Sequence, residues 1–462
     1  MSKSTAIIEA MRDALPPGRA ALSHSDISAL RDLTAALMTA RPEAVSEYQR
    51  FLAIAGRGLC LPEEQLAGRL RGATVLVTGG TGCIGSTLMA QLAMRGPARM
   101  VSVSRGVTAA ATRVEHAEYL DADVTDCAAI ERIAADVKPD IVFHLAAQRS
   151  PGLAEAEVRR TVSTNVLGTR NVLAASAAAG ARQVVLASTG KALRPYSPEV
   201  YTASKRAAEW IAATAASNGE VICSAARFTH VIDNSIIHGR LLDWAAEADG
   251  TASTGAVQGS VVRLHNADIA FYVQSALESA QLLLIAMLSA VPGEFRVHAI
   301  TDLGWPVSLL DFALGVLAAA HSATPVYISG YDPGYEEVSF PGLYDPATAG
   351  DVSPLLNVFE VAAMTETLCP LVDTFRLEMT ADPAAPKLLA NIATACDRGF
   401  CDDAIRQALD DLSWSLLDAT LAAAAPATLA RCAKLTSRHA NAVSPAHLRV
   451  MRAIRAHADG RP

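Results

Sequence analysis

The chain has 462 residues, of which 51% are hydrophobic and 19% are charged, and its formal net charge is −8. This length accommodates roughly two or three domains with large buried cores, and the composition is unlike that of a disordered chain. The acidic balance argues against a nucleic-acid partner held through its phosphates. The eight cysteines include no C-x-x-C pair, which favours free thiols in a reducing compartment over a disulfide framework or a metal site.

No apolar segment near the amino terminus has the character of a signal peptide. The most apolar run, residues 282–291, is much shorter than the ~20 residues that a membrane span requires. We therefore expect a buried helix there, no association with a membrane and a cytoplasmic location.

Residues 1–72 are expected to form a helical amino-terminal extension. Apolar side chains recur at helical spacing at Ile27, Leu30, Leu33 and Leu37. Pro42 and Pro62 are expected near the starts of two further helices. The segment carries no catalytic motif, so we interpret it as a packing or dimerisation element, and we expect a homodimer.

From residue 73 the pattern alternates between strands and helices. Strands are expected at 73–78, 100–104, about 120–123, 140–146, 182–188 and 221–228, and helices include a long one over about 154–179 and another over about 201–216. This alternation predicts an α/β fold with a Rossmann-type, doubly wound parallel sheet within residues 73–345, where ligands bind at the carboxyl ends of the strands. A small substrate lobe is expected mainly at residues 230–265 and 290–345.

Residues 346–462 are expected to form a helical carboxyl-terminal extension. No strand pattern is recognised there, and helices are predicted at 354–368, 384–396, 402–424 and 426–439.

A glycine cluster follows the first predicted strand and leads into a helix. Gly79, Gly82 and Gly85 recur every third residue, so the backbone can approach a diphosphate closely at a helix amino terminus. An ordinary tight turn is the alternative reading of such a pattern. The candidate cofactor-binding residues of this turn are Gly79, Thr81, Gly82, Cys83, Ile84 and Gly85.

The ends of the second and third strands indicate which dinucleotide is bound. Ser104 and Arg105 stand where an NAD site usually places an acidic residue, and a guanidinium suits a 2′-phosphate, so NADP is favoured over NAD. Asp123 and Val124 lie where an adenine amino group can be recognised. The alternative role for the stretch after the third strand is a helix cap formed by Thr125 or Asp126, and the two roles are compatible.

The candidate chemistry follows the fifth strand. Tyr201 and Lys205 are four residues apart and share one helix face. A cation beneath the phenol is expected to lower its pKa, so that Tyr201 can exchange a proton with a substrate oxygen near neutral pH. A hydroxyl from Ser188 or Thr189 can hold the same oxygen. Y-x-x-x-K alone is common by chance, but its place after this strand makes it informative.

These motifs together resemble the extended short-chain dehydrogenases/reductases of the epimerase/dehydratase type. The resemblance covers residues 73 to about 340 and is to the polysaccharide-biosynthesis branch that contains UDP-N-acetylglucosamine 4,6-dehydratases. The matching stretches are 78–86, 104–105, 123–124, 142–147, 164–169, 188–192, 201–205, 226–228, 263–265, 276–278 and 292–294.

The resemblance implies a role for each matching residue. The glycines would cradle the cofactor diphosphate, and Ser104 with Arg105 would hold the 2′-phosphate of NADP. The nicotinamide side would be lined by Ala146, Ala147 and Asn165. Thr189, Tyr201 and Lys205 would form the redox centre, and Lys191 matches the base that removes the sugar C5 proton in dehydratases.

Several positions depart from the pattern of that branch. Gly190 replaces the aspartate that protonates the leaving hydroxyl, and Tyr196 or Glu199 could compensate. Ala270 replaces an arginine that clamps the nucleotide diphosphate, while Asp332 and Glu336 replace an arginine and a lysine. Exchanging cations for acids disfavours a diphosphate. Arg263 or Arg240 could substitute for the lost cations.

Three functions remain open from the sequence. The first is NADP-dependent alcohol–ketone chemistry on a sugar nucleotide or related sugar, ending in epimerisation, dehydration or oxidation. The second is a ketoreductase or dehydrogenase acting on a natural-product intermediate without a diphosphate. The third is a non-catalytic, NADP-binding scaffold.

Overall fold

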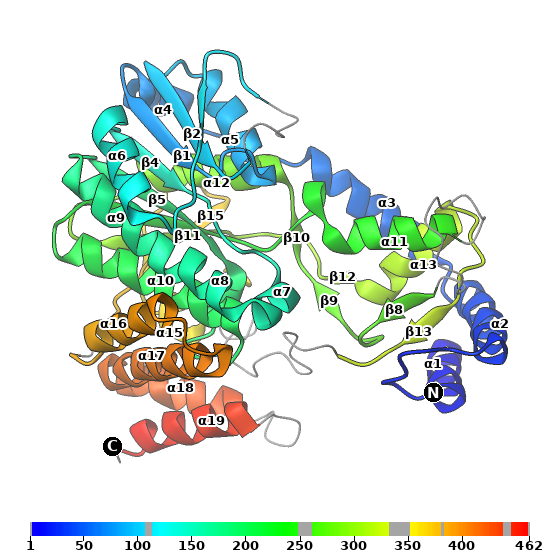
Figure 1. Ribbon diagram of the computed structural model, residues 1–462. Helices are drawn as coiled ribbons and strands as arrows, with labels where there is room; N and C mark the ends of the chain where they lie inside the picture. The colour runs from blue at the N-terminus through cyan, green and yellow to red at the C-terminus, as the bar shows by residue number, and fades with distance from the viewer. Residues whose placement is uncertain are drawn as a thin grey trace. The chain divides into compact units, whose positions relative to one another are not determined.

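The computed structural model describes residues 2–106, 113–247, 261–331, 352–379, 383–437 and 445–460 (Figure 1). The chain forms two compact units. The first consists of Met1–Arg57, His230–Ala276 and Leu303–Asp332, and the second of Gly58–Thr229, Leu277–Asp302 and Pro333–Pro462. This division differs from the predicted boundaries after residues 72 and 345. The amino-terminal helices share a hydrophobic core with the expected substrate lobe because each has an apolar face to bury.

The first unit is a helical layer with short paired strands. Its helices are α1 (Lys3–Ala14), α2 (His24–Ala40), α3 (Glu43–Ala53), α11 (Ile236–Glu247) and α13 (Leu309–Ala319). Its strand pairs are β7 (His230–Val231) with β10 (Val273–Gln274), β8 (Val262–Leu264) with β13 (Val326–Ile328), and β9 (Ala270–Phe271) with β12 (Val307–Ser308). Helices α3 and α13 pack closely at Gly315, where a Cβ atom would lie 2.3 Å from the carbonyl oxygen of Ala44.

The second unit is built on a nine-stranded sheet with the order β14-β15-β11-β6-β5-β4-β1-β2-β3. Its strands are β1 (Thr74–Thr78), β2 (Arg99–Ser104), β3 (Glu118–Asp121), β4 (Ile141–His144), β5 (Gln183–Thr189), β6 (Ile222–Phe228), β11 (Phe295–Ile300), β14 (Met364–Thr365) and β15 (Val372–Arg376). From β3 to β11 all neighbours are parallel, and β15 and β14 are added antiparallel. The predicted doubly wound, Rossmann-type sheet is confirmed.

The helices of the second unit flank this sheet. They are α4 (Glu63–Leu70), α5 (Cys83–Ala93), α6 (Cys127–Val137), α7 (Pro151–Ala156), α8 (Val158–Val162), α9 (Gly168–Ala178), α10 (Val200–Ser217), α12 (Ala276–Leu288), α15 (Val358–Val361), α16 (Ala385–Asp397), α17 (Asp402–Ala423), α18 (Pro426–Ser437) and α19 (Pro445–Ala458). The predicted buried helix at 282–291 corresponds to α12. The long helix predicted over 154–179 is instead divided into α7, α8, a π-helical turn η3 (Ser163–Leu167) and α9.

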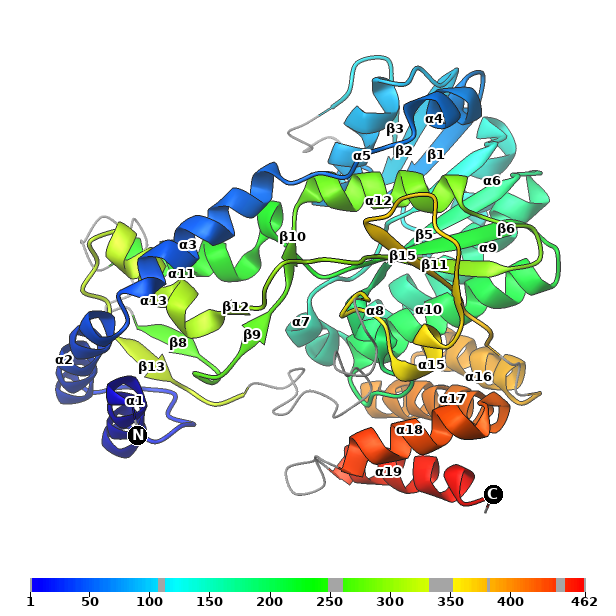
Figure 2. The same ribbon diagram turned by 180° about the vertical axis from the view of Figure 1, so that it is seen from behind.

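The carboxyl-terminal segment differs from its prediction. It was expected to lack strands, yet β14 and β15 extend the central sheet, because side chains on both faces of β15 are buried from Val372 to Phe375. The helix predicted over 354–368 is reduced to α15, and α19 was not predicted. Helices α16–α19 gather on the side of the sheet that carries α8 and α10, as Figure 2 shows from behind.

Across the described parts of the chain, no helix combines the length and the apolar character needed to cross a membrane.

Candidate functional site

The glycine turn between β1 and α5 is shaped by close backbone approaches. Gly79 has a φ of 77°, and a Cβ atom there would lie 2.8 Å from the nitrogen of Ala146 after β4. At Gly85 a Cβ atom would lie 2.1 Å from the carbonyl oxygen of Gly79. Gly82 is the N-cap of α5, and no side chain caps this helix. The cradle therefore has backbone walls and a helix amino terminus, which fits the diphosphate of a dinucleotide.

The other predicted residues of the turn lie beside these glycines. Cys83 and Ile84 begin α5, and the backbone N–H of Thr81 points to Ser104 Oγ at 3.4 Å. Gly80 was not among the predicted site residues, but a Cβ atom there would lie 2.4 Å from Ser102 Oγ. Position 80 requires glycine because a side chain of β2 approaches it closely, and β2 is distant from it in the sequence.

The ends of β2 and β3 meet at the same edge of the sheet. Ser104 is buried, whereas Arg105 is about half exposed and pairs with Asp123 at 3.4 Å. Asp123 also accepts hydrogen bonds from the N–H and hydroxyl of Thr125 at 2.9 Å. Asp126 caps α6 by accepting a hydrogen bond from the N–H of Ala129 at 3.0 Å, so the helix cap considered for this stretch is present. Val124 packs against α9, where a Cβ atom at Gly168 would lie 2.7 Å from its Cγ2.

A buried histidine joins β1, β4 and α9. His144 Nδ1 is hydrogen-bonded to Thr78 Oγ1 at 2.7 Å, and its Nε2 to Thr169 Oγ1 at 3.1 Å. Burial and the nearby charge of Lys205 lower the pKa of His144 to about 3. The ring is therefore neutral at physiological pH and acts as a hydrogen-bonding link between these elements.

The loop after β4 is fixed by Asn165 in the π-helical turn. Its Oδ1 accepts a hydrogen bond from the N–H of Gln148 at 2.8 Å, and its Nδ2 donates to the Gln148 carbonyl and to Ser204 Oγ at 3.1 and 3.0 Å. Asn165 thus holds the loop that contains Ala146 and Ala147 against α10. Ser204, which was not predicted, completes this link by donating to the carbonyl of Tyr201 at 2.8 Å.

Thr189, Tyr201 and Lys205 come together where β5 ends and α10 begins. Tyr201 is hydrogen-bonded to Thr189, and Lys205 Nζ donates to the carbonyl of Ala187 at 2.7 Å. Burial lowers the pKa of Lys205 to about 8. Burial also raises the pKa of Tyr201, against the smaller lowering effects of Thr189 and Arg149. The predicted lowering of the pKa of Tyr201 by Lys205 is therefore wrong, because desolvation dominates.

Lys191 lies in a cluster of charges beside this centre. Its Nζ and a guanidinium nitrogen of Arg194 each contact Glu199 Oε2 at 3.2 Å, and Thr202 donates to the same oxygen at 2.8 Å. Glu199 is the first candidate for a replacement acid, but its Oε2 is already engaged by Lys191, Arg194 and Thr202. Tyr196 was the other candidate, but it donates to Asp410 at 2.6 Å, and burial with this acid raises its pKa.

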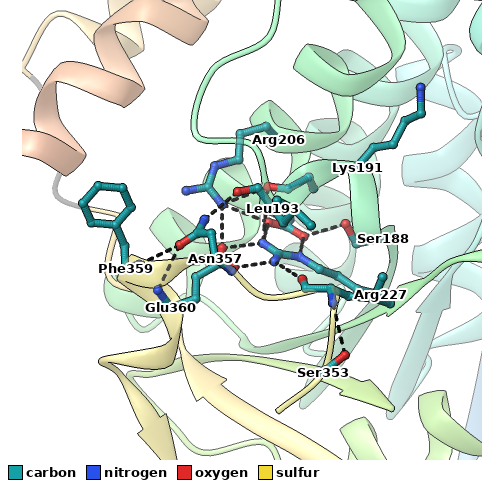
Figure 3. Close-up of polar contacts among 12 residues, drawn as sticks. Ser188, Lys191, Leu193, Arg206, Arg227, Ser353, Asn357, Phe359 and Glu360 are labelled. Atoms are coloured by element: carbon teal, nitrogen blue, oxygen red, sulfur yellow. Dashed lines mark hydrogen bonds and ion pairs between the residues drawn. The ribbon is translucent and has the colours of Figure 1, made fainter. Parts of the chain in front are cut away.

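A buried ionic cluster supports the end of β5 (Figure 3). Arg227 on β6 contacts Glu209 on α10 at 2.8 Å and Glu360 on α15 at 2.7 Å. Arg206 contacts Glu360 at 3.2 Å, and Ser188 donates to Glu209 at 2.6 Å. Burial opposes the charge on Arg227, but the two carboxylates raise its pKa above the usual value. The positive charges of two guanidinium groups therefore compensate the negative charges of two carboxylates in the interior.

Comparison with known proteins identifies the sequence from β1 to α11. Residues 75–240 match the family model that is described as "NAD dependent epimerase/dehydratase family". This core belongs to the NAD-dependent epimerase/dehydratase family. The probable polysaccharide biosynthesis protein EpsC of Bacillus subtilis is 26% identical over 296 residues, which cover 60% of this chain and 47% of that protein. A UDP-glucose 4-epimerase of Mycolicibacterium smegmatis is 35% identical over 120 residues, covering 25% of this chain and 38% of that protein.

Among solved structures, Pen from Bacillus thuringiensis has a TM-score of 0.55 at 20% identity, covering 68% of this chain and 89% of Pen. At this identity the similarity establishes the fold. The chain spans about half the length of EpsC.

The positions that depart from the epimerase/dehydratase branch have structural consequences. A Cβ atom at Gly190 would lie 2.6 Å from Leu355 Cδ2, so an aspartate there would require Leu355 to move. Ala270 lies exposed on β9 of the first unit. Arg263 donates to the carbonyls of Arg19 and Ala20 at 3.0 Å. Asp332 and Glu336 lie outside the described residues.

Sequence reasoning missed the residues that support the site from a distance. Arg227 was noted only as part of a family motif, and Glu209 could have been found as the residue four positions after Lys205 on α10. Glu360 and Leu355 gave no signal, because their segment is remote in sequence and was predicted to be helical. The side chains of both are buried against the core of the second unit.

Proposed function

We propose that this chain is an NAD(P)-dependent enzyme of the epimerase/dehydratase type that interconverts a secondary alcohol and a ketone on a sugar nucleotide. The observation that carries the proposal is the meeting of Thr189, Tyr201 and Lys205 at the sheet edge where the glycine turn also lies. In open α/β sheets this edge is where ligands bind. Membership of the family supports the substrate class.

The side chains divide the acid–base work. Thr189 and Tyr201 would both bond the reacting oxygen, and Tyr201 would take its proton during oxidation and return it during reduction. Because the pKa of Tyr201 is raised, the resting phenol is protonated and suited to donating to a carbonyl oxygen, and it must first lose this proton to solvent before it can accept one from an alcohol. Bound NAD(P) would supply hydride acceptance and return. Lys205, with its pKa near 8, remains mostly charged at neutral pH and would place a positive charge near the reacting centre.

Lys191 would act on the carbon beside the ketone. Its ammonium group is paired with Glu199, so it must first pass a proton to solvent or substrate before it can accept one. Proton exchange at that carbon leads to epimerisation, or to dehydration if a further acid protonates the leaving group. Leu355 beside Gly190 favours the outcomes that need no acid at position 190.

The preferred cofactor of this proposal is NADP. Arg105 at the end of β2 is about half exposed and can form charge-assisted hydrogen bonds with a 2′-phosphate. The family description names NAD, so the two dinucleotides should be compared directly. The homodimer stays a prediction, which light scattering can check.

The direct experiment incubates the purified protein with NADP or NAD and with UDP- and dTDP-sugars, and separates the products by chromatography. We expect a changed sugar nucleotide without net consumption of cofactor, and much less product from Tyr201→Phe. Absence of both sugar-nucleotide binding and product would contradict the proposal.

A second candidate is a ketoreductase or dehydrogenase whose substrate has no diphosphate. Two observations favour this second function. Ala270 has no charge to offer a diphosphate, and the guanidinium group of Arg263 already donates to two backbone carbonyls. Stoichiometric oxidation of NADPH with a carbonyl substrate, together with no affinity for UDP, would support this function over the first.

A further inference from the structure

The loop between β5 and α10, residues 190–200, carries Lys191 and leads directly into Tyr201. We call it the catalytic loop. Tyr196 at its middle is 4% exposed and belongs to a hydrophobic core otherwise formed by α17, α18 and α19. Its ring meets Trp414 edge to face at 5.3 Å, and its hydroxyl donates to Asp410 at 2.6 Å. The loop is therefore anchored in the carboxyl-terminal helices.

A second contact lies at the start of the loop. Asn357 Nδ2 donates to the carbonyl of Leu193 at 2.5 Å, and Leu355 fills the space beside Gly190. The carbonyl of Leu355 in turn accepts a hydrogen bond from Arg227 at 3.0 Å. Figure 3 shows Asn357 and Glu360 reaching the buried ionic cluster while Lys191 points away from it.

A third contact fixes the end of the loop. Val200 is the first residue of α10, and its N–H donates a hydrogen bond to Glu155 on α7 at 2.8 Å. The other carboxylate oxygen of Glu155 is bound by Arg406 of α17. Arg406 therefore acts through Glu155 on the helix start that presents Tyr201.

We propose that α15 and α17 of the carboxyl-terminal segment form a positioning element for the catalytic loop, acting through Asn357 beside α15 on Leu193, and through Asp410 and Arg406 of α17 on Tyr196 and on the Glu155–Val200 contact. The inference deepens the proposed function and rests on it for the identity of the reaction. Tyr196, Asp410 and Arg406 are positioning residues, because none of them belongs to the Thr189–Tyr201–Lys205 centre.

The physical reason is the accuracy that proton transfer requires. A displacement of ~1 Å at a reacting group can reduce the rate ~10²-fold, and ordering a loop on substrate binding costs conformational entropy. Contacts at the start, middle and end of the loop hold it in one conformation before substrate binds. The glycine turn has its own backbone contacts with the loop after β4, so we expect the turn to keep its shape, and its affinity for a cofactor, without this support.

The test compares Tyr196→Phe, Arg406→Gln and their combination with wild type and with Asp411→Asn. Asp411 lies on α17 next to these residues but contacts only the exposed Gln407 in the described structure. We expect kcat to fall about tenfold for each single variant and more for the combination, with KM and the affinity for NAD(P) within twofold. Arg406→Lys should recover part of the loss, and Asp411→Asn should resemble wild type.

A second measurement needs no substrate. The ¹³Cζ resonance of Tyr201, assigned by its absence in Tyr201→Phe, reports the pKa of this phenol. Loosening the loop admits water, so we expect the raised pKa of Tyr201 to move down toward its usual value in the combined variant. If kcat and this pKa both match those of Asp411→Asn, the positioning role is refuted.

Equal losses in kcat and in cofactor affinity would also refute it, because they indicate general unfolding. If wild type acts on no sugar nucleotide, the proposed function fails, while the NMR titration still decides the positioning role.

Discussion

The glycine turn and the catalytic loop lie at the same edge of the sheet, with β4 between their strands, but are stabilised in opposite ways. The turn is shaped by its own small residues, since Gly79 and Gly85 allow contacts of backbone with backbone. The catalytic loop is shaped by large side chains from a segment more than 150 residues away, including Asn357 and Asp410. The comparison teaches that the shape of the glycine turn can be recognised from local sequence, whereas the shape of the catalytic loop depends on distant segments that pack around it.

The largest effect is expected from Tyr201→Phe. Removing the phenolic hydroxyl removes the general acid–base group, which typically contributes ~10²–10⁴-fold to the rate. Steady-state kinetics should show this loss in kcat, and NAD(P) affinity measured by fluorescence should stay within a few-fold of wild type. Full activity in this variant would show that Tyr201 is not the general acid–base group of the reaction.

Glu360→Gln should strongly destabilise the second unit. The change leaves Arg206 and Arg227 buried with only Glu209 as a countercharge, and breaking a buried ion pair costs roughly 3–5 kcal/mol. Urea denaturation measures the difference. The exposed Glu64→Gln provides the control, and an equal unfolding midpoint for both would show that the cluster is dispensable.

Because of Lys205, the free energy of unfolding should change with pH in the alkaline range. Its pKa is about 8 in the folded chain against a usual 10.5, so folding releases its proton between these values. Stability should therefore rise as pH increases from 8 to 10.5, by an amount on the order of 3 kcal/mol. The gain is absent below pH 8, where Lys205 is charged in both states.

The difference between wild type and Lys205→Met in urea unfolding at pH 7.5 and pH 10 isolates this group from the other titrating residues. The variant should be inactive and relatively more stable at pH 7.5. A constant difference across this range would show that Lys205 is not desolvated.

Gly85→Ala should weaken the cradle more than Gly82→Ala. The new Cβ atom would lie 2.1 Å from Gly79 O at position 85 but 3.3 Å from it at position 82. Overpacking of this kind costs roughly 1–3 kcal/mol, so cofactor affinity, measured by calorimetry, should fall about tenfold or more only for Gly85→Ala. Equal affinities would mean that the cradle adapts and is not defined by its backbone.

The smallest effect is expected from Arg105→Gln. The side chain is half exposed, so its loss should leave folding intact and reduce affinity for NADP about tenfold, which is ~1.4 kcal/mol. Affinity for NAD should be unchanged, and Arg132→Gln on α6 serves as a control. Equal loss for both dinucleotides would remove the basis for preferring NADP.

Much of the sheet and the glycine turn after β1 were predicted from the sequence. Apolar runs such as 74–78 indicate buried strands directly. A glycine cluster between a strand and a helix indicates a tight turn at that point. The failures have a common cause. β15 was missed because one short strand gives little local signal, and the pKa of Tyr201 was misjudged because burial cannot be seen in a spacing of four residues.

The sequence by itself determined the order of the strands from β1 to β6, the glycine turn after β1, and the placement of Tyr201 and Lys205 four residues apart on one helix, because each depends on residues within a few positions of one another. Only the tertiary structure decided that Glu199 pairs with Lys191, that Tyr196 is an anchor with its hydroxyl on Asp410, and that Leu355 lies against Gly190. These features arise from side chains brought together by burial of apolar surface, and local sequence does not record which distant segments will share that surface.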